Sequence, residues 1–269
     1  MTTLRVSPRS RRLAGFVRTI AYNEAVLPPA LERIMPTAGV DLMLNLDADE
    51  FRTYHGDDLS DVHRAPGAIL GGPHTTATVI DTLNMRCCVS VMFRPGAARA
   101  LFGVPMTEAS DALVPLEALW GHDGATLRDR VLEAAIPAQK LHVVEDVLLE
   151  RITGRQPERS ILCAAAALEN GARVADATDQ TGLSARTFVR MFREHFGLTP
   201  KRFARVGRLQ RLLRSVASDR DIDWARAAVE HGFFDQSHLV NDFRELTGIT
   251  PTAYEARSAD AHNHVPVAS

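Results

Sequence analysis

Apolar and polar positions follow two different periods along this chain, and the change between them comes near residue 95. In VDLMLNL, residues 40 to 46, the valine and the three leucines occupy every second position, which is the period of a β-strand. TTATVID (75–81) and RCCVSVMF (86–93) have strand-like composition, and DTLNM at their junction is short enough for a hairpin connection. The first 95 residues or so are therefore predicted to be mainly β.

After Pro95 and Gly96 the apolar residues recur every three or four positions, which is the period of a helix. This pattern predicts helices in AARALFG (97–103), TLRDRVLEAA (126–135) and QKLHVVEDVLLERI (139–152). The last of these carries an apolar stripe made of Leu141, Val144, Leu148 and Ile152. Such a stripe either packs on its own domain or forms a seam between two copies of the chain.

The polar stretch TGRQPERS (153–160) contains Gly and Pro and marks a domain boundary, beyond which the whole chain has helical periodicity. Short helices are predicted to end at Gly171, Gly182, Gly197 and Gly232. PKRFARVGRLQRLLRSVAS (200–218) is predicted to be one long amphipathic helix. The resulting order is helix, turn, helix, long helix, then helix, turn, helix again.

These elements predict an α+β protein. A β-rich domain with helices is expected over residues 1–155. An all-α domain, residues 156–257, is expected to hold two helix-turn-helix modules joined by the long helix. The tail SADAHNHVPVAS, residues 258–269, is expected to be disordered.

One short sequence motif occurs twice in the helical part of the chain. Under a shift of 51 positions, GLSARTFVRMFREHFGLTP (182–200) matches GFFDQSHLVNDFRELTGITP (232–251) at its Phe-Arg-Glu, Gly and Thr-Pro positions. Ser184 and Asp235 stand before the second helix of each copy, where an oxygen can accept a hydrogen bond from a first-turn amide. The duplication suggests two similar probes that act together.

The second helix of each copy has one side for its own domain and one side for a partner. At about 100° per residue, the inward sides carry Phe188, Phe192 and His195 in the first copy and Leu239, Phe243 and Leu246 in the second. The opposite sides carry Arg186, Arg190 and Arg193 in the first copy and Ser237, Asn241 and Arg244 in the second. Arg matches guanine O6 and N7, and Asn matches adenine N6 and N7, so these helices are predicted to enter DNA major grooves.

The formal net charge of the chain is -2, but its C-terminal domain is basic. Residues 1–172 hold 17 Lys and Arg against 21 Asp and Glu, whereas residues 173–257 hold 14 against 11. Taken alone, the arginine-rich stretch from 186 to 214 could be a solvated face, but beside a duplicated motif it favours nucleic acid. Because the second copy carries Asp235, Asp242 and Glu245, we expect the first copy to supply most of the affinity and salt dependence. The second copy is expected to supply finer sequence preference.

Other protein classes find less support. Cys87, Cys88 and Cys163 form neither an even disulfide framework nor a metal-ligand spacing. No run approaches the roughly 18 apolar residues of a membrane helix. The start MTTLRVSPRSRRLAGFVRTI has arginines without the apolar core of a secretory signal, so the default expectation is a cytoplasmic protein, with a transit peptide left open.

Two alternative functions remain open at this point. A metal-dependent enzyme on the β domain would draw on His55, His63 and His74, but their spacing matches no ligand motif. A helical protein-interaction module without a DNA role is the other alternative. No nucleophile or phosphate-loop pattern is present, so we expect no catalytic residue, no bound metal and no cofactor.

Residues 157–257 resemble the DNA-binding domain of the AraC/XylS family of bacterial transcription regulators. The resemblance rests on GLSARTFVRMFREHFGLTPKRF and GFFDQSHLVNDFRELTGITPTAY, joined by RLQRLLRS. By position it implies base contacts from Arg186, Val189, Arg190, Gln236, Ser237, His238 and Asn241. Phosphate contacts are expected from Arg193, Lys201, Arg202 and Arg244. Position 241 is often basic in relatives and Val189 is apolar, so the target sequence does not follow from the resemblance.

The N-terminal part resembles an uncharacterised β-rich domain that precedes this module in some members, through VSVMFRPGAARALFGVP and VPLEALWG. In the family such domains bind a small effector or mediate dimerisation, often on a cupin-like barrel. The Gly-rich loop LGGPH motivates the hypothesis of a small ligand here. Double-stranded DNA is the expected partner, while RNA polymerase, an effector, a homodimer and the choice between activation and repression stay open.

Overall fold

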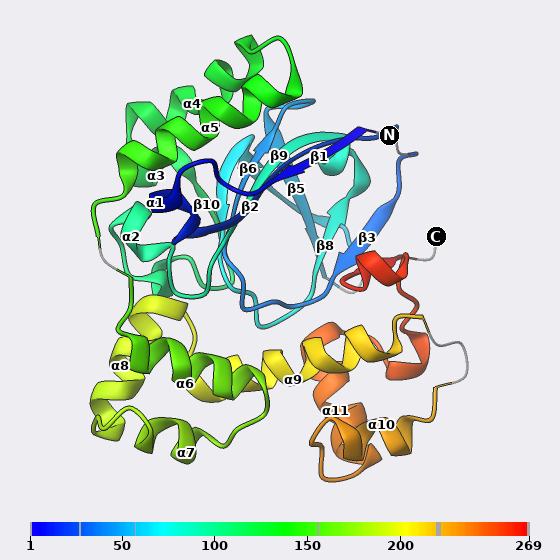
Figure 1. The fold of residues 1–269 in the computed structure, drawn as a ribbon. Helices are drawn as coiled ribbons and strands as arrows, with labels where there is room; N and C mark the ends of the chain where they lie inside the picture. Colours follow the sequence, from blue (N-terminus) through cyan, green and yellow to red (C-terminus); the bar gives the residue numbers. More distant parts are fainter. Residues whose placement is uncertain (1, 27, 57, 155, 219–221, 268–269) are drawn as a thin grey trace.

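The computed structural model describes residues 2–26, 28–56, 58–154, 156–218 and 222–267 (Figure 1). It has the predicted α+β composition, with a β-rich N-terminal part followed by a helical C-terminal part. The strands are β1 (Thr2–Val6), β2 (Val17–Glu24), β3 (Leu31–Ile34), β4 (Asp41–Asn45), β5 (Glu50–His55), β6 (Asp61–Pro66), β7 (Ala68–Gly71), β8 (Thr78–Asp81), β9 (Cys87–Phe93), β10 (Leu113–Pro115) and β11 (His264–Pro266).

The helices are numbered in chain order, and most of them follow the strands of the N-terminal part (Figure 1). The α-helices are α1 (Arg11–Ala14), α2 (Arg99–Phe102), α3 (Leu116–Trp120), α4 (His122–Glu133), α5 (Pro137–Arg151), α6 (Arg159–Glu169), α7 (Val174–Asp179), α8 (Ala185–Phe196), α9 (Pro200–Val216), α10 (Trp224–Glu230) and α11 (Gln236–Thr247). Short 3₁₀ helices are η1 (Thr82–Met85), η2 (Met106–Glu108), η3 (Pro251–Ala253) and η4 (Ala259–Ala261). Among the described residues, no helix combines the length and the apolar character needed to span a membrane.

The strands form two antiparallel sheets. One has six strands in the order β1-β2-β9-β4-β7-β10, and the other has five in the order β11-β3-β8-β5-β6. Helices α1 to α5 pack their apolar sides against the six-stranded sheet in one core. The stripe of Leu141, Val144, Leu148 and Ile152 is buried in that core, with at most 8% of each residue exposed. It therefore packs on its own domain, and the seam between two copies finds no support in this stripe.

The three strands expected from the alternating segments are present as β4, β8 and β9, but the expected hairpin is wrong. Strand β8 belongs to the five-stranded sheet and β9 to the six-stranded sheet, so the two do not pair. The carboxylate of Asp81 accepts a hydrogen bond from the Leu83 amide at 2.9 Å and caps η1. This one-turn helix carries the chain from one sheet to the other. A tight turn would instead have paired β9 with β8 in the same sheet.

The C-terminal tail is ordered where the structure describes it, which corrects the expected disorder. Strand β11 pairs with β3 in antiparallel register, and Val265 is buried. The buried carboxylate of Glu32 lies 2.9 Å from both Arg257 Nη1 and His264 Nδ1. The hydrogen bond with His264, helped by Arg257, lowers the pKa of Glu32. The tail thus ties the second helical module to the N-terminal sheet.

The C-terminal helices form two small cores that share α9. The first core joins α6, α7 and α8 to the start of α9, around Phe188, Phe192, Phe196 and Phe203. The second core joins the later part of α9 to α10 and α11, and it includes Met35 from the N-terminal part. Because α9 is a single helix of 17 residues, it sets the separation of the two modules.

Candidate nucleic-acid interface

Helices α8 and α11 begin and end in the same way. The Ser184 hydroxyl accepts a hydrogen bond from the Thr187 amide, and the Asp235 carboxylate accepts one from the His238 amide, so both predicted N-caps are confirmed. Both helices end at a left-handed glycine, Gly197 with φ of 75° and Gly248 with φ of 73°. Glycine adopts this conformation without the steric cost of a Cβ, so both helices stop at the same point of the repeat.

The outward side of α8 carries the three predicted arginines. Arg186, Arg190 and Arg193 are exposed, and Val189 is half-buried beside them. Arg190 Nη1 donates to Glu194 Oε1 at 2.9 Å, and Glu194 also pairs with Arg99 of the N-terminal part at 3.2 Å. The inward side is Phe188, Phe192 and Phe196, whereas His195, expected to face inward, is only half-buried.

The outward side of α11 carries neutral hydrogen-bonding groups. Gln236, Ser237 and Asn241 are exposed, as is Arg244 one turn further along. His238 is half-buried, and its Nδ1 accepts a hydrogen bond from the Phe234 amide at 3.1 Å. Because Nδ1 is an acceptor, the neutral ring carries its proton on Nε2 and can donate from that atom.

The acidic residues of α11 are neutralised by arginines of α9. Arg205 Nη2 lies 2.8 Å from Asp242 Oδ1, and Arg208 Nη2 lies 2.7 Å from Asp242 Oδ2. Arg205 also makes a two-pronged pair with Glu245, at 2.7 and 2.6 Å. These bonds raise the pKa of Arg205 and lower the pKa of Glu245. The sequence suggested that Asp242 and Glu245 repel phosphate; in the fold their main role is to fix α11 against α9.

The cations expected at phosphates lie near the start of α9. The Thr199 hydroxyl accepts a hydrogen bond from the Arg202 amide at 3.3 Å and caps this helix. Lys201 and Arg202 follow it, and both side chains are exposed. Within the described part of the chain, neither side chain forms an ion pair, so both are available to an anionic partner.

Comparison with known families decides what this part of the chain is. A family model described as a helix-turn-helix domain matches residues 177–257, from within α7 to beyond the end of α11. The C-terminal part of the chain is an AraC-type helix-turn-helix domain. The chain is therefore a DNA-binding transcription regulator. A second model, a domain of unknown function (DUF6597), matches residues 5–115.

Solved structures give a more distant likeness. The apo form of a single-residue variant of ToxT from Vibrio cholerae strain SCE256 aligns with a TM-score of 0.44 at 11% identity, over 87% of this chain and 96% of that one. ToxT from Vibrio cholerae O395 bound to (E)-4-(8-methylnaphthalen-1-yl)but-3-enoic acid aligns with a TM-score of 0.43 at 11% identity, over 94% and 98%. No curated protein sequence matches the chain.

The AraC-type domain docks on the N-terminal part through the ends of α8 and α11. A Cβ at Gly197 would lie 2.6 Å from Pro73 and 2.7 Å from the carbonyl oxygen of Met106, so α8 ends directly on these residues. At the end of α11, the Ala77 amide donates to the Leu246 carbonyl at 2.8 Å. One loop, residues 72–77, thus contacts the ends of α8 and α11 together.

Sequence reasoning missed one surface residue of the AraC-type domain. Phe234 is 89% exposed and directly precedes the N-cap of α11. In the pair Phe233-Phe234 the first ring is buried under the guanidinium of Arg208, 4.6 Å away, and the second has no place in the core. The available signal was the aromatic doublet itself, of which only Phe233 is buried.

The histidines considered for a metal site do not converge. The rings of His55 and His63 lie 4.6 Å apart, and His63 lies 3.1 Å from Asp61. His74 instead lies on the loop that contacts the ends of α8 and α11, where burial lowers its pKa. Over the residues that the structure describes, no group of three or more His, Cys, Asp or Glu side chains is arranged to hold a metal ion.

Proposed function

We propose that the chain reads a bipartite, non-palindromic DNA site with α8 and α11 in successive major grooves of one duplex, under the control of its N-terminal domain. The observation that carries this proposal is that α8 and α11, each capped and exposed on one side, pack in two modules that share the single continuous helix α9. At 1.5 Å per residue, α9 spans about 25 Å. With the widths of α8 and α11 added, the separation is compatible with the roughly 34 Å between major-groove segments on one face of DNA.

The two helices have different parts in this proposal. Arg186 and Arg190 suit guanine, and Val189 suits a thymine methyl group. Gln236, Ser237, His238 and Asn241 offer hydrogen bonds to base edges with little net charge. Phosphates would be held by Arg193, Lys201, Arg202 and Arg244, which fixes the register of the protein on DNA. The first helix therefore supplies most of the salt-dependent affinity, and the second refines sequence preference.

Control by the N-terminal domain is supported by where that domain touches the helices. The loop of residues 72–77 contacts the ends of α8 and α11, and the Arg33 guanidinium donates to the Thr247 carbonyl at 3.2 Å. A shift of this loop would change the relative setting of the two recognition helices. A small effector, RNA polymerase and a second copy of the chain are the partners through which such control would act.

Selection of DNA from a random library with the purified full-length chain tests this proposal. The expected motif has two different half-sites with centres roughly 10 bp apart. Binding should weaken steeply as salt rises, because phosphate contacts release counterions. Enrichment of no motif, together with binding that salt does not weaken, would overturn the DNA-reading proposal in favour of a protein-interaction module.

Phe234 is expected to contribute an apolar contact to the second half-site. An exposed ring at the head of a groove-entering helix is positioned to cover a thymine methyl group or a deoxyribose. Phe234→Ser should weaken binding by roughly 5- to 10-fold and relax the preference at one base pair. Competition binding against single-base variants of the site measures both effects. Val229→Ser, which removes another exposed apolar side chain but lies on α10, is the matched control and should leave the preference unchanged.

A further inference from the structure

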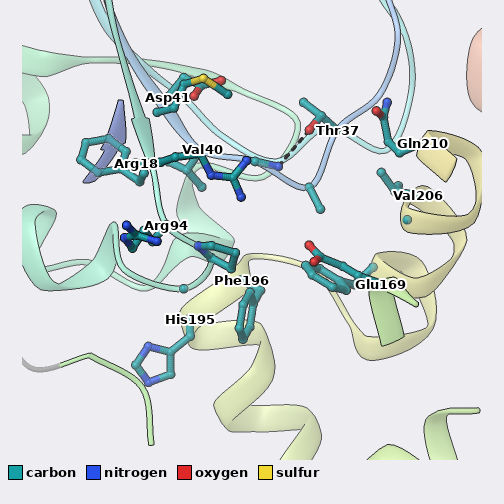
Figure 2. Close-up of a pocket in the computed structure, with 18 of the residues that line it drawn as sticks. Arg18, Thr37, Val40, Asp41, Arg94, Glu169, His195, Phe196, Val206 and Gln210 are labelled. Atoms are coloured by element: carbon teal, nitrogen blue, oxygen red, sulfur yellow. Dashed lines mark hydrogen bonds between the residues drawn. The ribbon is translucent and has the colours of Figure 1, made fainter. Parts of the chain in front are cut away.

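A cleft of about 260 Å³ lies between the N-terminal part and the AraC-type domain (Figure 2). Its upper wall comes from β2, β4 and β9 with the segment 37–40, and its lower wall comes from α6, α8 and α9. Because both parts of the chain build it, a molecule bound there touches the N-terminal sheet and the DNA-binding helices at once.

The sheet side of the cleft presents two charged groups by its local geometry. The pairing of β2 with β9 shifts between Val17 and Thr19, which leaves Arg18 as the extra residue of a bulge. A bulge redirects the side chain that it adds. Asp41 pairs with Met92 across β4 and β9, and these two side chains lie on the face that lines the cleft. Figure 2 shows the Arg18 guanidinium in the space between Asp41 and Glu169.

The charges that line the cleft are not used by the fold. Within the described residues, the side chains of Arg18, Asp41, Glu169 and Arg214 form no hydrogen bond or ion pair with another residue. Burial raises the pKa of Asp41 to about 6, against the opposing effect of Arg18. Burial likewise raises the pKa of Glu169, against Arg18, Arg214 and Arg211. Both carboxyls thus lack the close cationic partner that would stabilise their charge.

The remaining lining limits what could bind. Phe196, Phe203 and Val206 give the lower wall an apolar surface. The imidazole of His195 turns away from the cleft (Figure 2), so it does not contribute a ligand group. Three arginines against two carboxyls make the lining net positive, with Arg94 near its edge. A suitable ligand is small, carries an anionic group for the arginines and a cationic donor for a carboxyl, and has a short apolar part.

We propose that this cleft binds a small zwitterion of the amino acid class, with its carboxylate held by Arg18 and Arg214 and its ammonium held by Asp41. The bound molecule bridges the two parts of the chain and stabilises their docked arrangement, in which loop 72–77 contacts both recognition helices. Only this regulatory consequence rests on the proposed DNA function; the binding itself does not.

Isothermal titration calorimetry on the full-length protein, without DNA, tests the binding. The probes are the twenty proteinogenic amino acids, the α-keto acids of the same carbon skeletons and the corresponding amines. At least one amino acid should bind with a Kd on the order of 1–100 µM. Its keto acid and its amine should each bind at least 10-fold more weakly, since each lacks one of the two charges.

Variants of the cleft complete the test. Arg18→Gln and Asp41→Asn should each weaken binding at least 10-fold, while Arg11→Gln, an exposed arginine on α1, should not. Circular dichroism and thermal melting would verify that the variants fold. Failure of all amino acids to bind, equal binding of the keto acid, or binding unchanged by both cleft variants would overturn the proposal. None of these results depends on DNA, so they leave the reading of a bipartite site to its own test.

Discussion

Replacing Arg190 by alanine is expected to weaken binding to the selected DNA site by roughly 10- to 100-fold and to reduce the salt slope by about 1. Arg190 is exposed on the outward side of α8, and its bond to Glu194 is a surface pair that contributes little stability. Glu194 retains Arg99 as a partner when Arg190 turns to DNA. Fluorescence anisotropy at several salt concentrations measures both quantities.

Two further substitutions serve as comparisons for Arg190→Ala. Arg130→Ala removes an exposed arginine from α4, far along the chain from either module, and should change neither affinity nor slope. Asn241→Ala should reduce affinity for the selected site but leave the salt slope unchanged, because a neutral side chain releases no counterion. Equal losses of affinity with equal slopes for Arg190→Ala and Asn241→Ala would contradict the division of work between the two helices.

Replacing Asp242 by alanine is expected to destabilise the chain by about 3–5 kcal/mol, because it leaves two arginines without their shared partner in a largely buried site. The Asp242 side chain is 13% exposed and accepts from both Arg205 and Arg208. The substitution should also weaken DNA binding, although Asp242 faces α9, because α11 loses its fixed setting. Urea unfolding gives the stability, and DNA binding under folded conditions gives the second effect.

Glu245→Ala is the matched control for Asp242. Glu245 binds the same Arg205, but its side chain is 69% exposed. Its removal leaves Arg205 with Asp242 and should change stability much less. If both variants had the same stability as the unchanged chain, the α9 and α11 network would not fix the second module, and its rigidity would need another origin.

The features that the sequence predicted well are local. The caps at Ser184 and Asp235 depend on bonds to residues three positions on, and Gly197 and Gly248 end their helices through their own backbone conformation. The stripe on α5 and the phenylalanines of α8 follow from helical periodicity, which one segment contains in full. Such information is present in a window of a few residues, so the repeat could be recognised without any knowledge of the rest.

The features that the sequence could not provide depend on distant partners. Glu32 meets His264 across 232 positions, and Arg33 meets Thr247 across 214, so neither contact has a local pattern. The contact between Arg205 and Asp242 also lacks a local pattern, because 37 positions separate the two residues. Charge alone suggests that the arginine attracts phosphate and that the aspartate repels it. The crossing from β8 to β9 was missed because a five-residue connection suits a hairpin and a sheet change equally well.

The dependence of affinity on the spacing of the two half-sites shows whether α8 and α11 act as one rigid pair. Inserting 5 bp or 10 bp between the half-sites should reduce affinity to that of a single half-site in both cases, because one continuous helix holds α8 and α11 at a fixed separation. Anisotropy with the three DNA duplexes measures this. Recovery of full affinity with the 10 bp insertion, or equal affinity for all three duplexes, would contradict the claim.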